Sequence, residues 1–89
     1  MQVTIDVIKY IEAAGNYTKV ITNSETITVR EKISDVLAFL DNDNFIQVHK
    51  SFAVSKKDIT SIEGNRIHIQ DNIIPIGKMY KMNVNKILG

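Results

Sequence analysis

The 89-residue chain contains no cysteine, which excludes disulfides, a thiol nucleophile and Cys-based zinc sites. No apolar run approaches the roughly 20 residues that cross a bilayer as a helix. The N-terminus does not have the basic and then apolar pattern of a signal peptide. We therefore expect neither a membrane segment nor a leader, and a cytoplasmic location fits.

Recognisable catalytic motifs are missing as well. The sequence contains no HExxH, GxSxG, P-loop or GxGxxG pattern, so it gives no basis for metal-dependent hydrolysis, acyl transfer or nucleotide binding. Its two histidines, His49 and His68, fall in separate expected strands. His68 alternates with an isoleucine on each side, which favours a solvated or edge position. We expect the protein not to be an enzyme and to hold no metal or cofactor.

What the chain does contain is a globular composition with an uneven charge distribution. Its 44% hydrophobic and 24% charged residues are typical of a folded domain, and we expect one domain over residues 1–89. Residues 1–44 hold four basic and seven acidic side chains, whereas residues 45–89 hold seven basic and three acidic ones. A basic half indicates an anionic partner, such as nucleic acid or a membrane surface, without identifying it.

Short β-rich segments make up most of the sequence. Alternating or β-branched runs predict strands in VTIDVIKYIEA, YTKVIT, ETITVR, ITSIE, RIHIQ and IIPIG, and one further strand in FIQVHKSFAV at residues 45–54. Turns are expected at residues 23–24, 64–65 and 71–72, which are rich in Asn, Asp, Ser and Gly. These segments predict a mostly β protein.

One segment has helical periodicity instead. Its apolar residues recur at i, i+3, i+4 and i+7, which predicts one short helix at about residues 31–41. The DNDN sequence that follows ends this helix, because Asn and Asp side chains compete for backbone hydrogen bonds. The C-terminal segment KMYKMNVNKILG is compatible with a last strand or with a helical turn.

These periodicities also predict a core. Strand alternation and the helical stripe place the following apolar side chains inward: Ile11, Val20, Ile33, Val36, Leu37, Leu40, Phe45, Val48, Phe52, Val54, Ile59, Ile62, Ile67, Ile69 and Ile76. Lys56 and Lys57 are expected outside it, either solvated or bound to phosphate.

Polar and basic residues gather at three separated places. The first is AAGNYTKV at residues 13–20, where a tight Gly-Asn turn precedes three side chains that can form hydrogen bonds. The second is His49-Lys50-Ser51, where strand alternation would put His49 and Ser51 on one face and Lys50 on the other. The third is PIGKMYKMN at residues 75–83, where Pro and Gly bend the chain before two lysines. The structural alternatives are a plain hairpin loop, a histidine at the edge of the core and a solvated basic terminus.

These three places carry a resemblance to a known family. YIEAAGNYTKVIT, FIQVHKSFAVS and IPIGKMYK, with the expected helix VREKISDVLAFL between the first two, together resemble the LytTR domain. This domain is the DNA-binding output domain of a class of bacterial response regulators. The resemblance extends from about Ile8 to Leu88. It implies a mostly β fold of small stacked antiparallel sheets with one short helix, in which loops rather than a recognition helix contact double-stranded DNA.

The resemblance also implies which residues contact DNA. Carried onto this sequence, they are Asn16, Tyr17, Thr18, Lys19, His49, Lys50, Lys78, Met79 and Lys81. Lys50 or Lys78 could donate to guanine in the major groove, Asn16 could pair with adenine, and the methyl group of Thr18 could meet a thymine methyl. His49 is expected partly to orient Lys50. Met79 departs from the family pattern, which often has a basic residue there.

Further expectations concern partners. The resemblance implies a two-component transcription regulator, with a receiver domain in the full-length protein and paired direct repeats as the DNA target. Family members usually have a further strand before VIKYIEA; we expect this strand and the receiver domain to be absent here, and the isolated domain to be a monomer. The alternative is a protein-interaction module that reuses the fold without reading DNA. RNA binding is disfavoured, because only six aromatic residues are available for base stacking.

Overall fold

The computed structural model describes residues 4–88 and has a mostly β architecture. Its strands are β1 (Ile8–Ala14), β2 (Tyr17–Thr22), β3 (Thr26–Val29), β4 (Phe45–His49), β5 (Phe52–Ser55), β6 (Ser61–Glu63), β7 (Arg66–Ile69) and β8 (Asn72–Pro75). Two α-helices, α1 (Ile33–Leu40) and α2 (Lys81–Leu88), and three short 3-10 helices, η1 (Ile5–Val7), η2 (Lys56–Asp58) and η3 (Lys78–Tyr80), complete this part of the chain.

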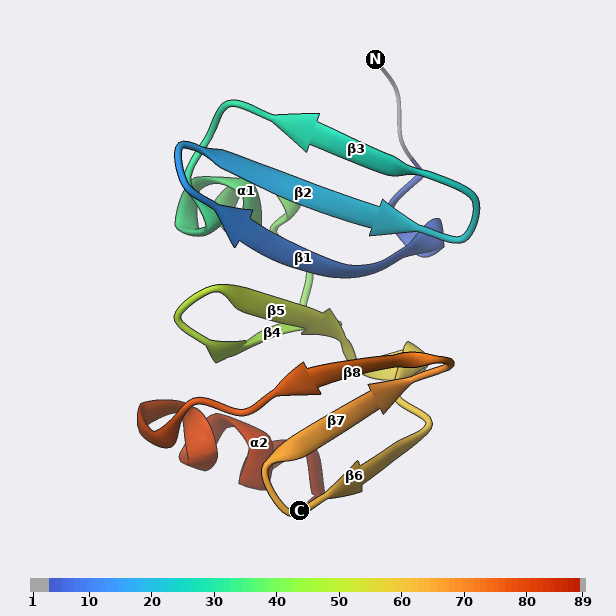
Figure 1. Ribbon diagram of the computed structural model, residues 1–89, viewed down its shortest axis with the longest axis vertical. Coiled ribbons are helices and arrows are strands. Elements are labelled where there is room, and N and C mark those ends of the chain that lie inside the picture. The colour runs from blue at the N-terminus through green and yellow to red at the C-terminus, as the bar shows by residue number, and fades with distance from the viewer. Residues whose placement is uncertain (1–3, 89) are drawn as a thin grey trace.

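The strands form two antiparallel sheets that follow one another along the longest dimension of the molecule (Figure 1). The first has five strands in the order β3-β2-β1-β5-β4, and the second has three in the order β6-β7-β8. The predicted fold of stacked antiparallel sheets is therefore confirmed, as is the short helix near residues 31–41. That helix ends at Leu40, because Asp41 has a left-handed φ of 41°. The C-terminal segment, which the sequence left open, forms the second helix.

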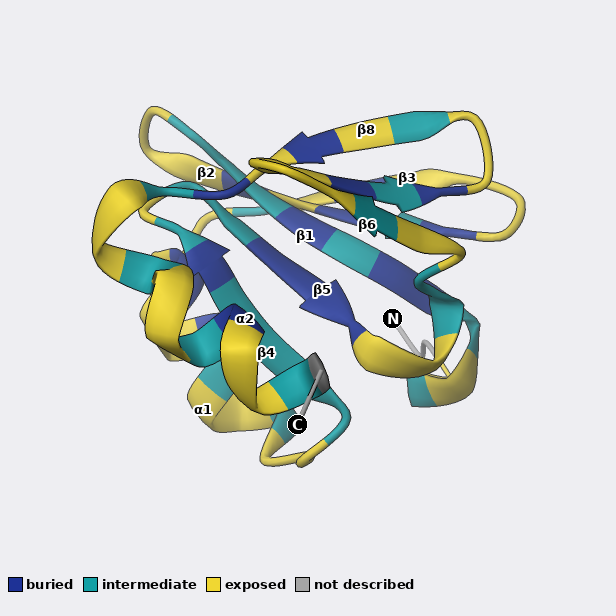
Figure 2. Cartoon of the chain, turned by 90° about the horizontal axis from the view of Figure 1, so that it is seen from below, coloured by how far each residue is buried: buried dark blue, intermediate teal, exposed yellow. Residues whose placement is uncertain are grey.

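Two hydrophobic cores lie on opposite faces of the five-stranded sheet. The first lies between this sheet and α1, and the second lies between the β4–β5 end of the sheet, the three-stranded sheet and α2. Strand β5 serves both, since Ala53 belongs to the first core and Val54 to the second, and each is 0% exposed. Figure 2 shows the buried residues along β1 and β5, with exposed residues in the turns and on the outer faces of the helices.

Every residue of the predicted core is either buried or packed, partly exposed, against one of these two cores. Phe52 is only partly buried, and its ring lies 6.5 Å from that of Tyr10. Burial raises the pKa of the Tyr10 phenol, and the nearby charge of Glu12 raises it further. The prediction missed some apolar core members: Ile8, Ile27, Ala53, Ile74 and Val84.

The prediction of one strand over residues 45–54 is wrong. These residues form a hairpin, in which β4 and β5 pair and Lys50-Ser51 is the two-residue turn between His49 and Phe52. Neither Lys50 nor Ser51 has a positive φ, so the turn does not need the Gly or Asn that usually marks a two-residue hairpin. An irregularity in the pairing between Gln47 and His49 accompanies this turn.

The expected turn at residues 71–72 lies one residue earlier. Gln70 takes the left-handed conformation, with a φ of 54°, and Asn72 is already the first residue of β8. The Gln70 side chain accepts a hydrogen bond from the Lys9 amine, which is buried beneath it. This contact joins the two sheets at the end away from the β4–β5 turn. The expected turns at 23–24 and 64–65 are confirmed by the strand bounds, and Gly64 has a φ of 57°.

Candidate nucleic-acid interface

The three polar places of the sequence lie on one side of the molecule. The β1–β2 turn, the β3–α1 connection, the β4–β5 turn and the chain after β8 all reach the left side in Figure 1. The backbone N–H of Ala13 donates to the carbonyl of Ser51 at 2.8 Å, and that of Gly77 donates to the carbonyl of Val48 at 2.7 Å. The first hydrogen bond connects β1 to the β4–β5 turn, and the second connects the chain after β8 to β4. We call this surface, made of residues 15–19, 30–32, 49–51 and 77–81, the loop edge.

The first segment of the loop edge is the β1–β2 turn. Gly15 has a φ of 64°, and Asn16 beside it is exposed. The alternation of β2 turns Tyr17 and Lys19 outward, whereas Thr18 is 0% exposed and its hydroxyl donates to the carbonyl of Glu31 at 2.5 Å. Thr18 is therefore not accessible for the thymine contact that the sequence analysis suggested. Its role is to fix the β3–α1 connection against β2.

The second segment is the β4–β5 turn, which is held by side chains. The Nδ1 atom of His49 accepts a hydrogen bond from the backbone N–H of Ser51 at 3.0 Å, and its ring lies edge-on to Phe52 at 5.5 Å. The Gln47 amide nitrogen donates to the carbonyl of His49 at 3.1 Å and lies 3.4 Å from that of Lys50. His49 is thus a structural residue of the turn, while the side chain of Lys50 is exposed.

Removing the Gln47 amide tests this arrangement. Gln47→Leu keeps the volume of the side chain but leaves the carbonyls of His49 and Lys50 without this donor. We expect a loss of about 0.5–1.5 kcal/mol in the free energy of unfolding, as is usual for a hydrogen bond of this kind. Urea denaturation measures it. A variant that is as stable as the original would show that the turn is held without the amide.

The third segment follows β8 and passes close to the second. A Cβ atom on Gly77 would lie 3.2 Å from the Cα of His49 and 3.0 Å from the ring of Tyr80. Glycine is therefore favoured here by close packing rather than by its φ, which is −71°. Beyond it, Lys78, Met79 and Lys81 are exposed, Met79 to 91%. The structure thus places this segment beside His49.

The β3–α1 connection is a fourth segment, which the sequence analysis missed. It brings Arg30 and Lys32, both exposed, to the loop edge, and the Arg30 guanidinium carbon lies 5.7 Å from the centroid of the Tyr17 ring. The pairing of β2 with β3 is the signal that could have identified this segment. It places Thr18 opposite Val29, so that the residues just beyond them, Tyr17 and Arg30, also lie side by side. The loop edge thus carries the following exposed cations: Lys19, Arg30, Lys32, Lys50, Lys78 and Lys81.

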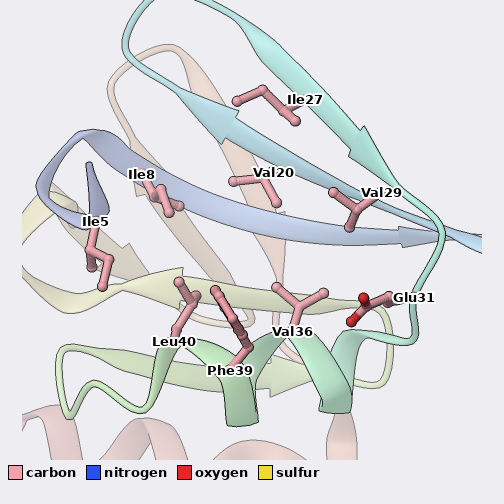
Figure 3. Close-up of a pocket in the computed structure, with 9 residues that line it drawn as sticks. All are labelled: Ile5, Ile8, Val20, Ile27, Val29, Glu31, Val36, Phe39 and Leu40. Carbon is pink, nitrogen blue, oxygen red and sulfur yellow. The ribbon is translucent and has the colours of Figure 1, made fainter. Parts of the chain in front are cut away.

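Other surfaces differ from the loop edge. An apolar cleft of about 310 Å³ opens beside the first core, between α1 and the strands, with Ile8, Val20 and Ile27 facing Val36 and Phe39 across it (Figure 3). Its apolar lining does not suit a polyanion. Lys57 lies at the other end of β5 and is paired with Asp6 at 3.5 Å. Within residues 4–88, no group of three or more metal-ligating side chains occurs, and no helix is long and apolar enough to span a bilayer.

Comparison with known proteins agrees with this geometry. The LytTr DNA-binding domain of a putative methyl-accepting/DNA response regulator from Bacillus cereus has a similar structure, with a TM-score of 0.89 and 24% sequence identity over 100% of this chain and 87% of that one. None of the curated proteins compared with the chain matches it. The sequence profile of the LytTr DNA-binding domain matches residues 1–89. The chain belongs to the LytTR family of DNA-binding domains.

Proposed function

We propose that the domain binds double-stranded DNA in a sequence-specific manner through its loop edge, as the output domain of a bacterial two-component transcription regulator. The observation that supports this most directly is the loop edge itself, where segments far apart in the sequence are tied together by main-chain hydrogen bonds and present exposed cations. Membership of a DNA-binding family supports the same partner. The similarity to a domain of a response regulator supports the regulatory context.

The dimensions of the molecule suit contact along one turn of DNA. Its longest extent is 35 Å, and the loop-edge segments follow one another along this axis in Figure 1. One turn of B-DNA rises by about 34–36 Å. The two outer segments, the β1–β2 turn and residues 78–81, are proposed to enter the major groove, with the β4–β5 turn between them.

Two kinds of contact are needed on such a surface. Lysines that neutralise phosphates release counterions and give affinity that falls with salt. We assign this role to Lys19, Lys78 and Lys81, which are exposed. Base preference requires donors or acceptors that reach base edges, and Asn16 and Lys50 are the exposed side chains at the tips of the two hairpin turns.

The proposal extends to assembly. We propose that a receiver domain accompanies this domain in the full-length protein and that the DNA target is a pair of direct repeats. The isolated domain is proposed to be a monomer that pairs only on DNA. Analytical ultracentrifugation at micromolar concentration checks this, and a tight dimer in the absence of DNA would contradict it.

Binding to a library of genomic duplex fragments, measured at 50 mM and 200 mM salt, tests the function. We expect a few fragments to be enriched at both salt concentrations, and binding to unrelated fragments to be largely lost at the higher one, because non-specific binding is almost entirely electrostatic. Uniform weak binding that vanishes with salt would contradict sequence specificity. No binding at either concentration would contradict DNA binding altogether.

A protein-interaction module is the second candidate. It is favoured by Phe39, which is 87% exposed at the rim of the apolar cleft. Large exposed apolar side chains beside a groove are typical of interaction surfaces. If no duplex of the library binds, this candidate replaces the first.

A further inference from the structure

The guanidinium of Arg30 is held in place although its hydrogen-bond donors are unused. Arg30 directly follows β3, and its guanidinium carbon lies 5.7 Å from the centroid of the Tyr17 ring, which is 41% exposed. Within residues 4–88, no carboxylate lies within ion-pair distance of Arg30, and no acceptor takes a hydrogen bond from its side chain. An arginine on an aromatic face is ordered by a cation–π contact while its N–H groups remain available to an anion.

The position of this pair is fixed by the strands. Thr18 pairs with Val29 in the antiparallel strands β2 and β3, so Tyr17 and Arg30 are the adjacent residues across the two strands. They lie at the end of the strand pair next to the β1–β2 turn. The hydroxyl of Thr18 also holds the carbonyl of Glu31 at 2.5 Å. The backbone on both sides of Arg30 is therefore anchored. The guanidinium lies over the ring of Tyr17, the residue that begins β2 after the β1–β2 turn.

The geometry points to a DNA-backbone contact made by Arg30, and we propose that its guanidinium binds a phosphate flanking the groove that the β1–β2 turn enters. Tyr17 is then a positioning residue, whose ring holds the guanidinium, rather than a DNA contact of its own. This inference rests on the proposed DNA binding. It adds a fourth segment, outside the three that the resemblance to the family implies.

A phosphate suits this guanidinium better than a base edge. The side chains proposed to read bases, those of Asn16 and Lys50, stand at the tips of their turns, whereas Arg30 lies back over the Tyr17 ring at the side of the hairpin. The planar fork of N–H donors matches the oxygens of a phosphate in two-point contact. A phosphate contact fixes the orientation of the protein on the duplex and carries no sequence information.

Titrations of the preferred duplex and of a scrambled duplex over a range of salt concentrations test the proposal. Arg30→Ala is expected to weaken binding to both duplexes by the same factor, about tenfold, and to reduce the slope of log K against log salt by about one. Arg30→Lys should keep the slope and lose only part of the affinity, because the charge remains and the two-point contact does not. Lys57→Ala, at the other end of β5, is the control and should change neither quantity.

The role of Tyr17 is tested separately. Tyr17→Phe keeps the ring and should bind as the original does, whereas Tyr17→Leu should weaken binding to both duplexes. Combining Tyr17→Leu with Arg30→Ala should be no worse than Arg30→Ala alone, because both remove the same contact. Thermal melts of each variant show whether it is folded.

Three results would overturn the inference. Arg30→Ala could bind both duplexes as the original does, or it could lose affinity for the preferred duplex alone, which would make Arg30 a base reader. The losses from Tyr17→Leu and Arg30→Ala could also be fully additive, which would separate the two residues. If the original domain binds neither duplex, the proposed function fails and this inference fails with it. A domain that binds its preferred duplex while Arg30→Ala has no effect contradicts only the inference.

Discussion

Lys50→Ala is expected to cost about 1–3 kcal/mol of binding free energy on the preferred duplex and to relax the preference at one base position. Binding to a scrambled duplex should be nearly unchanged. The reason is that Lys50 stands in a two-residue turn whose backbone is held by the His49 ring and the Gln47 amide, so that its side chain starts from a fixed point of the backbone. Titration of the variant against the preferred duplex and its single-base variants measures both effects.

Lys57→Ala is the matched control for this experiment. Lys57 is also an exposed lysine beside β5, but it lies at the opposite end of that strand and is paired with Asp6, a surface ion pair of little energetic weight. Its removal should change binding to neither duplex. If the two lysine variants are indistinguishable on both duplexes, the β4–β5 turn does not read bases.

Ile67→Ala is expected to lower the free energy of unfolding by about 2–5 kcal/mol. Ile67 is 0% exposed at the centre of the three-stranded sheet and belongs to the core between the two sheets. Truncating it leaves a cavity that the neighbouring strands cannot fill. Domains of this size have a total stability of about 5–15 kcal/mol, so a large share would be lost. Urea denaturation of the variant measures the change.

Ile73→Ala provides the comparison within the same sheet. Ile73 stands on β8, next to the strand that carries Ile67, but its side chain is 58% exposed. The same truncation should therefore cost less than about 1 kcal/mol. Equal losses at the two positions would contradict the assignment of Ile67 to the core and of Ile73 to the surface.

Much of the fold follows from periodicity in the sequence. Alternation placed Ile67 and Ile69 inward and His68 between them on the other face, where it now pairs with Glu63 at 3.2 Å. The i, i+3, i+4 pattern located α1. These features depend on residues close together in the chain, so the hydrophobic periodicity of a short segment predicts them.

The errors concern features that depend on distant residues or on side-chain hydrogen bonds. The Lys50-Ser51 turn was missed because its backbone is held by His49 and Gln47 rather than marked by glycine. Arg30 was missed because its partner, Tyr17, lies across a strand pair.

Thr18 shows a third limit. The sequence analysis assigned Thr18 to the DNA surface because it belongs to the polar segment at residues 13–20. The alternation of side chains along β2 buries it instead. Neighbourhood along the chain thus picked out segments that lie on one side of the molecule, but not the direction in which each side chain points.

The two bonds that tie the loop edge together, from Ala13 to Ser51 and from Gly77 to Val48, join main-chain atoms only. Exposed side chains such as those of Asn16, Lys50 and Met79 take no part in these two hydrogen bonds. Substitutions at these positions can therefore leave the backbone frame of the loop edge in place. Under the proposed function, such a frame allows a duplicated gene to acquire a new DNA target through a few substitutions. It gives protein engineers the same freedom, with Gly77 as a position where an added side chain would crowd His49 and Tyr80.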